Sequence, residues 1–190
     1  AAARGLPGPF LVVNADLPTA SAELLGRRPP KLAYSPSCVL VHAGGSLTFP
    51  GTAHHTIDFG RQWNRTFAEL IDDGALMSDP SFLVTNPTVT DPSLAPAGRQ
   101  TYYILFPTPN TRTTRTDWAG YPDQMLDTLE KHGYAGLRDS LECMHVTTPL
   151  DWEAQGITAG APFAAAHSFG QTGPFRPSTL DRRIENLVFT

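Results

Sequence analysis

The chain has 190 residues, of which 41% are hydrophobic and 17% are charged, and its formal net charge at pH 7 is −4. This length and apolar content are enough for a domain with a substantial buried core. The acidic balance excludes nucleic acid as an expected partner, because phosphate binding needs clustered basic residues. No run of lysines or arginines predicts docking on an anionic membrane either. No apolar run approaches the ~20 residues that span a bilayer, and no secretory leader is visible, so we expect a cytoplasmic protein.

The first predicted elements are a strand and a helix. The apolar run Phe10–Val13 is typical of a short buried strand. Asp16 then has the residue type and position of a helix N-cap, and Gly26 those of a helix end. The spacing places Leu24 and Leu25 on the buried side of this helix. The start of the chain therefore reads as a β–α unit, followed by a charged, proline-rich linker at residues 27–31.

The middle of the chain predicts a sheet interrupted by helices. Five apolar or alternating runs have strand character, namely residues 37–44, 54–60, 81–87, 101–109 and 143–149. Two amphipathic helices are expected, over residues 63–74, with Trp63, Phe67, Leu70 and Ile71 as one apolar stripe, and over residues 122–133. Thr148 and Asp151 have the spacing of a capping box, which predicts a further helix start. Cys38 and Cys143 could pair, but their strand-like surroundings favour reduced core thiols.

This order of elements favours an α+β fold with a mixed, largely antiparallel sheet and helices on one face. The short, solidly apolar runs at the two ends, Phe10–Val13 and Leu187–Phe189, are instead typical of a parallel sheet covered on both faces. A parallel sheet needs several strands. We therefore expect the ends to be pieces of a second domain whose other strands lie outside this chain.

Common catalytic and metal-binding motifs are absent from the sequence. His54 and His55 are adjacent, so within a strand they would point to opposite faces and could not share one ion. The sequence contains no HExxH, GxSxG, GxGxxG or Walker motif. We therefore expect no metal site, and no pyrophosphate cradle within this chain.

The stretch "GAPFAAAHSFGQTGPFRP", residues 160–177, combines aromatic residues with many glycines, prolines and alanines. Small residues allow a flat ligand to approach the backbone, and aromatic rings supply apolar contact area. Sparse polar groups in such a surround match a ligand pocket. The alternative is a proline- and glycine-rich loop that packs over a core, and composition alone does not separate the two interpretations.

Several long blocks carry a resemblance to a known family. These are "AHHTIDFG", "SDPSFLVTNPTVTDPSLAPAGRQTYYILFPTPN", "HVTTPLDWEAQGITAGAPFAAAHSFGQTGPFRP" and "IENLVFT", which follow in order along the chain. Together they resemble bacterial-type phytoene desaturases, which are carotenoid-forming flavoproteins related to amine oxidases. The resemblance implies a Rossmann-type FAD domain with an inserted substrate domain.

On this resemblance, residues 1–26 would be a piece of the FAD-binding domain, residues 27–177 the substrate-binding domain, and residues 178–190 the start of the C-terminal FAD-binding segment. The cofactor of the parent protein would be FAD, but the segments that grip it would lie beyond both ends of this chain. We therefore expect the chain alone to bind FAD poorly and to be inactive. The missing FAD-binding segments would be its intramolecular partners.

The resemblance also implies candidate site residues for a carotenoid or other isoprenoid substrate. The expected channel walls are apolar or aromatic, and they comprise His55, Ile57, Phe59, Tyr102, Ile104, Phe106, Phe163, Phe169, Thr172 and Phe175. Within them, two alternating sets are each expected to share one sheet face, His55 with Ile57 and Phe59, and Tyr102 with Ile104 and Phe106. His167, Gln171 and Arg176 are the candidate catalytic groups near the flavin, and Asn14 and Ala15 are the candidate cofactor contacts.

Two classes of function are open at this point. The first is a segment of an FAD-dependent oxidoreductase that desaturates phytoene or a related isoprenoid, with peripheral contact to the inner face of the membrane where such a substrate resides. The second is a non-catalytic apolar-ligand or interaction domain that keeps the channel without the cofactor. A truncated reading frame without its own function is a third interpretation. A flavin absorbance band separates the first class from the second.

Overall fold

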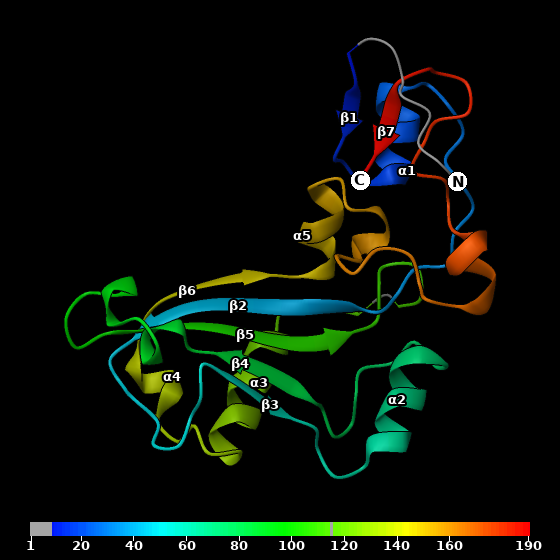
Figure 1. The fold of residues 1–190 in the computed structure, drawn as a ribbon. Coiled ribbons are helices and arrows are strands. Elements are labelled where there is room, and N and C mark those ends of the chain that lie inside the picture. The colour runs from blue at the N-terminus through cyan, green and yellow to red at the C-terminus, as the bar shows by residue number, and fades with distance from the viewer. Residues whose placement is uncertain (1–8, 115) are drawn as a thin grey trace.

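The computed structural model describes residues 9–114 and 116–190 (Figure 1). Its strands are β1 (Leu11–Val13), β2 (Ser37–Gly45), β3 (His55–Asp58), β4 (Phe82–Thr85), β5 (Gln100–Thr108), β6 (Leu141–Thr147) and β7 (Leu187–Phe189). Its α-helices are α1 (Leu17–Thr19), α2 (Trp63–Ile71), α3 (Tyr121–Lys131), α4 (Leu137–Ser140) and α5 (Pro149–Ala154). Shorter helical turns are the π-type η1 (Ala20–Leu24) and the 3₁₀ turns η2 (Pro87–Val89), η3 (Pro92–Leu94), η4 (Thr158–Gly160), η5 (Phe169–Gln171) and η6 (Gly173–Phe175).

The strands form two sheets of different kinds. Five strands in the order β3-β4-β5-β2-β6 make an antiparallel sheet, and β1 and β7 make a parallel pair. The predicted α+β fold with a largely antiparallel sheet is therefore confirmed. Long apolar and β-branched runs formed the strands as their pattern predicted, and β2 is flanked on both sides, as expected of a strand that is apolar on both faces.

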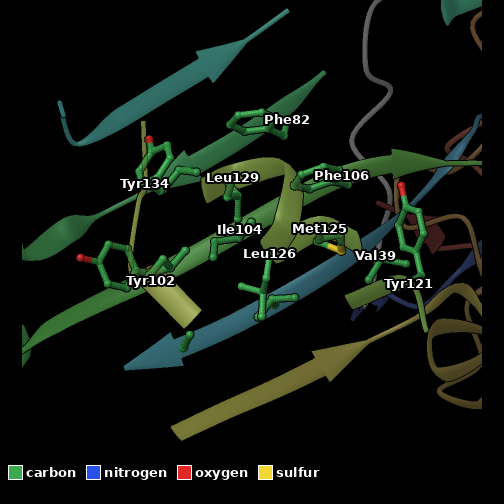
Figure 2. Packing of buried hydrophobic residues seen from close by; sticks show 14 of the residues in the cluster. Val39, Phe82, Tyr102, Ile104, Phe106, Tyr121, Met125, Leu126, Leu129 and Tyr134 are labelled. Carbon is green, nitrogen blue, oxygen red and sulfur yellow. The ribbon is translucent and has the colours of Figure 1, made fainter. Parts of the chain in front are cut away.

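The main core lies between one face of the five-stranded sheet and helix α3 (Figure 2). Val39, Ile104 and Phe106 point from β2 and β5 toward Met125 and Leu129 of α3, and all five side chains are buried. Register explains this shared face, because Val39 lies opposite Phe106 in the antiparallel ladder. Figure 1 shows α5 on the other side of the sheet, toward the parallel pair.

The parallel pair joins the two ends of the chain. Leu11 lies opposite Leu187 and Val13 opposite Phe189, and Val13, Ala20 and Leu187 form a second, small core. The two ends, expected to be pieces of one further domain, thus pair with each other, and the chain also supplies a second neighbour for the closing strand. β7 is paired on both sides, with β1 on one edge and with residues 179–181 on the other, where the Phe189 N–H donates to the Thr179 carbonyl at 2.8 Å.

The first helix differs from the prediction. Asp16 makes no side-chain cap to it; the Asp16 carboxylate instead accepts hydrogen bonds from the backbone N–H and hydroxyl of Thr158. The helix changes after α1 into the π-type turn η1, which rotates Leu24 outward so that it is 64% exposed. Leu25 is the leucine that packs against the small core. Gly26 follows with φ of +59°, the left-handed conformation that is typical of a glycine at a helix end, as predicted.

Candidate functional site

A cavity of about 490 Å³ lies where the parallel pair meets the loop 160–177, and we call it the strand-end cavity. Four segments distant in sequence close around it, and its lining includes Asn14, Ala15, Leu32, Tyr34, Phe163, His167, Gln171, Arg176, Thr179 and Thr190. The structure therefore brings both candidate cofactor contacts and all three candidate catalytic residues to one cavity. A concave, partly apolar site with a few polar groups has the form of a small-molecule site.

The carboxyl ends of β1 and β7 form one wall of the strand-end cavity. Asn14 and Ala15 directly follow β1, and Thr190 directly follows β7. The Thr190 hydroxyl donates to the Asn14 Oδ1 at 3.0 Å, which fixes the two strand ends together. Because the carboxyl ends of parallel strands in α/β sheets are where nucleotide-type ligands bind, this wall has the right form to contact a cofactor.

The opposite wall is the loop 160–177, and its backbone is held in place by a close approach. Gly160 has φ of +56°, and a Cβ at this position would lie 2.0 Å from the Pro149 carbonyl oxygen. Only glycine fits there. The loop then runs back along residues 33–35, which follow the linker, where the Ser35 N–H donates to the Ala164 carbonyl at 3.1 Å and the Ala166 N–H to the Ala33 carbonyl at 2.9 Å.

Gln171 acts as a clamp between this loop and the linker. Its Oε1 accepts from the Ala33 N–H at 2.7 Å, and its Nε2 donates to the Ala33 carbonyl at 3.0 Å and to the Ala166 carbonyl at 2.9 Å. Thr172 is held in a similar way, since its hydroxyl donates to the Ser168 carbonyl at 3.2 Å. The polar groups of Gln171 are thus used to shape the wall, which leaves His167 and Arg176 as the candidates with side chains available to a ligand.

A second cavity of about 490 Å³, which we call the helix-side cavity, adjoins the first. The two share Tyr34, Phe163, Ala165 and His167 in their linings. The helix-side cavity continues to Leu70 and Ile71 at the end of α2. Together their linings extend from the end of α2 to the carboxyl ends of β1 and β7.

Tyr34 stands at the junction of the two cavities. The Arg112 guanidinium lies 4.6 Å from the centroid of its ring, a cation–π contact that holds the ring in place. Burial raises the pKa of the Tyr34 hydroxyl above its ordinary value, although the neighbouring Arg112 opposes this. A neutral phenol at this position keeps the junction free of negative charge. Asn110 supports the same segment, because its Nδ2 donates to the Ser35 carbonyl at 2.9 Å.

Three predicted wall residues lie in the core instead of a channel. Tyr102, Ile104 and Phe106 do share one face, but helix α3 covers that face and all three are buried. Figure 2 shows them pointing into the packed interior. The alternating pattern fixes which residues share a face but not which face the helices cover, and this explains the error.

His55 and Ile57 lie on the opposite face of the same sheet. His55 is opposite Thr85 and Ile57 opposite Leu83, and Leu83 in turn is opposite Leu105, whose side chain points away from Ile104. The two predicted sets therefore do not come together. Phe59 follows β3 and packs against Trp63 of α2, with ring centroids 5.1 Å apart. Of the stripe predicted on α2, Leu70 is buried while Trp63 and Ile71 are exposed.

The three phenylalanines of the loop 160–177 separate. Phe163 lines both cavities, whereas Phe175 lines a different cleft and Phe169 lines none of the cavities described in this structure. The rings of Phe169 and Phe175 lie together on the surface, with centroids 5.7 Å apart. Of the predicted apolar wall, Phe163 is the member that lines the strand-end cavity.

Sequence reasoning missed the contribution of the linker to the site. Leu32 and Tyr34, which directly follow the predicted linker 27–31, line the strand-end cavity, although neither was singled out as a site residue. It also missed Leu70 and Ile71 as lining of the helix-side cavity. The apolar residues Leu32 and Tyr34, one residue after the proline pair, were the available signal, because apolar side chains usually pack against other parts of a fold.

The described residues show no metal-binding group. No set of three His, Cys, Asp or Glu side chains lies close enough to hold an ion among residues 9–114 and 116–190. His54 and His55 do approach each other, with ring centroids 4.5 Å apart, and the Nδ1 of His55 lies 2.9 Å from the Thr85 hydroxyl. Both Cys38 and Cys143 are free, Cys38 buried and Cys143 exposed. Across the same residues, no helix combines the length and apolar character needed to cross a membrane.

Comparison with known proteins places this geometry in context. The chain is 48% identical to a phytoene dehydrogenase of Streptomyces griseus over 192 residues, which cover 96% of this chain and 38% of that protein. The chain is a homologue of the phytoene dehydrogenases and desaturases. A zeta-carotene-forming phytoene desaturase of Myxococcus xanthus is 33% identical over 94% of the chain, and a 4,4'-diapolycopen-4-al dehydrogenase of Metabacillus indicus is 32% identical over 93%. The resemblance that the sequence blocks indicated is thereby confirmed.

The alignments to these desaturases and dehydrogenases extend over nearly the whole chain but cover only 36% to 38% of each relative. The chain thus spans little more than a third of the length of the relatives that it matches. No family model matches the chain.

Proposed function

We propose that the chain forms the substrate-binding part of a flavin-dependent oxidoreductase that desaturates phytoene or a related carotenoid. The observation that carries this proposal is the convergence of Asn14, Ala15, Phe163 and His167 on one cavity, in a chain homologous over nearly its full length to carotenoid desaturases and dehydrogenases. Activity would require the remainder of the protein, and the chain alone would be inactive.

The two adjoining cavities would hold the long apolar substrate. A polyene offers almost no hydrogen-bonding groups, so its binding free energy would come from buried apolar area, at about 25 cal/mol per Å². Leu70 and Ile71 would contact the distal part of such a chain, and Phe163 and Tyr34 the middle part. The neutral state of Tyr34 suits this role, because a charged group beside a polyene would lose hydration without gaining a partner.

The residues at the strand ends fit one edge of a flavin site. Asn14, Ala15 and Thr190 would border the cofactor, and the polar Asn14–Thr190 contact gives that wall hydrogen-bonding capacity beside otherwise apolar lining. The sequence contains no glycine-rich nucleotide loop, so these residues would contact the cofactor without holding its pyrophosphate. When bound, FAD supplies the acceptor for the hydride that leaves a C–H bond in desaturation.

His167 is the residue of this chain best placed to receive the accompanying proton. Its side chain lines both cavities, and an imidazole is the side chain whose ordinary pKa suits proton transfer near neutral pH. Gln171 would act as a positioning residue, because its amide is fully engaged by Ala33 and Ala166. Arg176 would line the polar rim of the cavity.

A chimera tests this proposal. The chain would replace the homologous segment of the Streptomyces griseus phytoene dehydrogenase, with which it shares 48% identity. We expect the purified chimera to carry the flavin absorbance band and to convert phytoene to more unsaturated products, as measured by liquid chromatography. His167→Ala in the chimera should lower the rate by about 100-fold or more without removing the flavin. A chimera that folds and binds flavin but leaves phytoene unchanged would contradict the proposal.

An apolar-ligand domain without catalysis is the second candidate, and the apolar lining of the helix-side cavity by Leu70, Ile71 and Phe163 favours considering it. The same chimera separates the two functions. If the chimera binds polyene and flavin but does not desaturate phytoene, the result supports ligand binding without catalysis as the function.

A further inference from the structure

The strand-end cavity contains a negative charge that a neutral polyene does not need. Among the residues that the structure describes, one acidic side chain lines this cavity, that of Asp16. Asp16 follows Asn14 and Ala15 at the carboxyl end of β1, on the wall that would border the cofactor. Within the same described residues, no ion pair joins Asp16 to a lysine, an arginine or a histidine. The wall therefore carries a carboxylate without a basic partner.

Neutral donors hold the Asp16 carboxylate in place. Its Oδ2 accepts hydrogen bonds from the Thr158 N–H at 3.2 Å, from the Thr158 hydroxyl, and from the Thr19 hydroxyl at 3.4 Å. These bonds offset part of the free energy that a carboxylate loses when it leaves water. None of the donors is cationic, so the carboxylate is fixed in position and its charge is not neutralised.

The charge of Asp16 acts on the middle of the cavity. Burial raises the pKa of the Tyr34 hydroxyl, and the negative charge of Asp16 raises this pKa further, against the opposing effect of Arg112. His167, the proposed proton acceptor, lines the same cavity from the loop 160–177. A polyene in the strand-end cavity would therefore lie between Asp16 on one wall and His167 on the other.

Desaturation creates a partner for such a charge. When a C–H bond breaks and its hydrogen leaves with both bonding electrons to the flavin, the substrate carbon becomes positive. A proton then leaves the neighbouring carbon to His167, and the electron pair of that C–H bond forms the new double bond. The substrate thereby loses two electrons to FAD. A carboxylate at Asp16 would attract the substrate only while it is positive, so it would bind the transition state more strongly than the neutral polyene.

We propose, resting on the desaturase function proposed above, that Asp16 is a catalytic residue that stabilises the positive charge on the polyene. A purely structural role, as a staple between the end of β1 and Thr158, is the alternative. Two substitutions separate the charge from the staple. Asp16→Asn removes the charge but keeps an oxygen that accepts from Thr158, whereas Thr158→Val removes the hydroxyl and keeps the charge.

Two isoprenoids of equal chain length test the charge on the chain itself. The probes are N,N-dimethylfarnesylamine, which is protonated near neutral pH, and farnesol, which is neutral, and calorimetry measures the affinity of each. We expect wild type to favour the amine by about tenfold, and Asp16→Asn to lose this preference. Thr158→Val should keep it, as should Glu153→Gln, the matched charge control at an exposed position outside both cavity linings. No preference in wild type, a preference that survives Asp16→Asn, or an equal loss in Glu153→Gln would overturn the role of Asp16.

The chimera with the Streptomyces griseus phytoene dehydrogenase supplies a second readout. Asp16→Asn in the chimera should lower kcat by about 100-fold, while KM for phytoene and the flavin absorbance change by less than about twofold. If the chimera desaturates phytoene and its Asp16→Asn variant does so at the full rate, the role of Asp16 is wrong and the proposed function stands. If the chimera with Asp16 intact folds, binds flavin and leaves phytoene unchanged, the proposed function fails, and the role of Asp16 fails with it.

Discussion

Arg27 and Asp181 show how single residues hold the ends of this chain together. They are 154 residues apart, and their ion pair is well shielded, with the Asp181 side chain 7% exposed. Hydrogen bonds with Arg27 and with the N–H groups of Arg183 and Ile184 lower the pKa of Asp181 to about 2. The carboxylate therefore ties the linker to the segment that leads into β7.

This pKa predicts a specific pH dependence for Asp181→Asn. The folded-state pKa of about 2 lies below the unfolded value near 4, so Asp181 stabilises the fold above about pH 4 and loses that contribution as the pH falls toward about 2. Urea unfolding should show wild type more stable than the variant at pH 6, with the difference shrinking between pH 4 and pH 2. A difference that stays constant over this range would contradict the assignment.

At the residue scale, sequence patterns predict neighbours within an element better than contacts between elements. The alternation in β5 correctly placed Ile104 and Phe106 on one face, but it did not show that α3 would cover that face, and Ile104 is 0% exposed. His167 and Asn14 were correctly singled out, and they line the same cavity. Tyr34 was missed because its role depends on the Arg112 guanidinium, 78 positions further along the printed sequence.

At the scale of elements, α5 connects the sheet to the loop that lines the cavities. Its capping box formed as the sequence predicted, because the Thr148 hydroxyl accepts from the Asp151 N–H at 3.4 Å and the Asp151 carboxylate accepts from the Thr148 N–H at 2.7 Å. Within the helix, the Trp152 indole N–H donates to the Cys38 carbonyl of β2 at 3.2 Å. The cap thus fixes the helix from which the loop 160–177 departs.

Removing this cap should lower stability by a defined amount. We expect Thr148→Ala to reduce the free energy of unfolding by about 1 kcal/mol, the usual cost of losing an N-cap side chain. Thr148→Ser keeps the hydroxyl, so it should change the free energy of unfolding by only a few tenths of the loss caused by Thr148→Ala. Urea denaturation of the three proteins measures both effects. If serine were as costly as alanine, the hydroxyl would not be the source of the stabilisation.

The elements that the sequence predicted well are those whose signals are local. Long apolar or alternating runs became β2, β5 and β6, and Gly74 follows α2 with φ of +60° as a helix-ending glycine does. The helix after β1 was predicted less well, because Asp16 occupies the N-cap position while its carboxylate accepts hydrogen bonds from Thr158 and makes none to the helix N-terminus. A contact across 142 residues has no local signature in sequence.

At the scale of the whole molecule, the strand-end cavity lies where segments from both ends of the chain meet residues 32–34 and the loop 160–177. The sequence suggested that residues 1–26 and 178–190 are parts of one further domain, and β1 and β7 do pair with each other. Their register and the partners along the second edge of β7 were not predictable, because strand pairing depends on tertiary geometry. Under the proposed function, substrate binding would therefore be a property of the assembled chain.

Polyene uptake is the measurement that tests the central claim most directly. The chain would be mixed with lycopene in detergent, passed over a gel-filtration column, and its bound pigment measured by visible absorbance. We predict retention by wild type and by Ala22→Trp, an exposed control position outside the cavity linings. Ala165 lines both the strand-end and the helix-side cavity, so a tryptophan there would fill the space between them. The variant Ala165→Trp should remain folded and should retain at least about tenfold less pigment than wild type. Equal pigment on both variants would contradict the account.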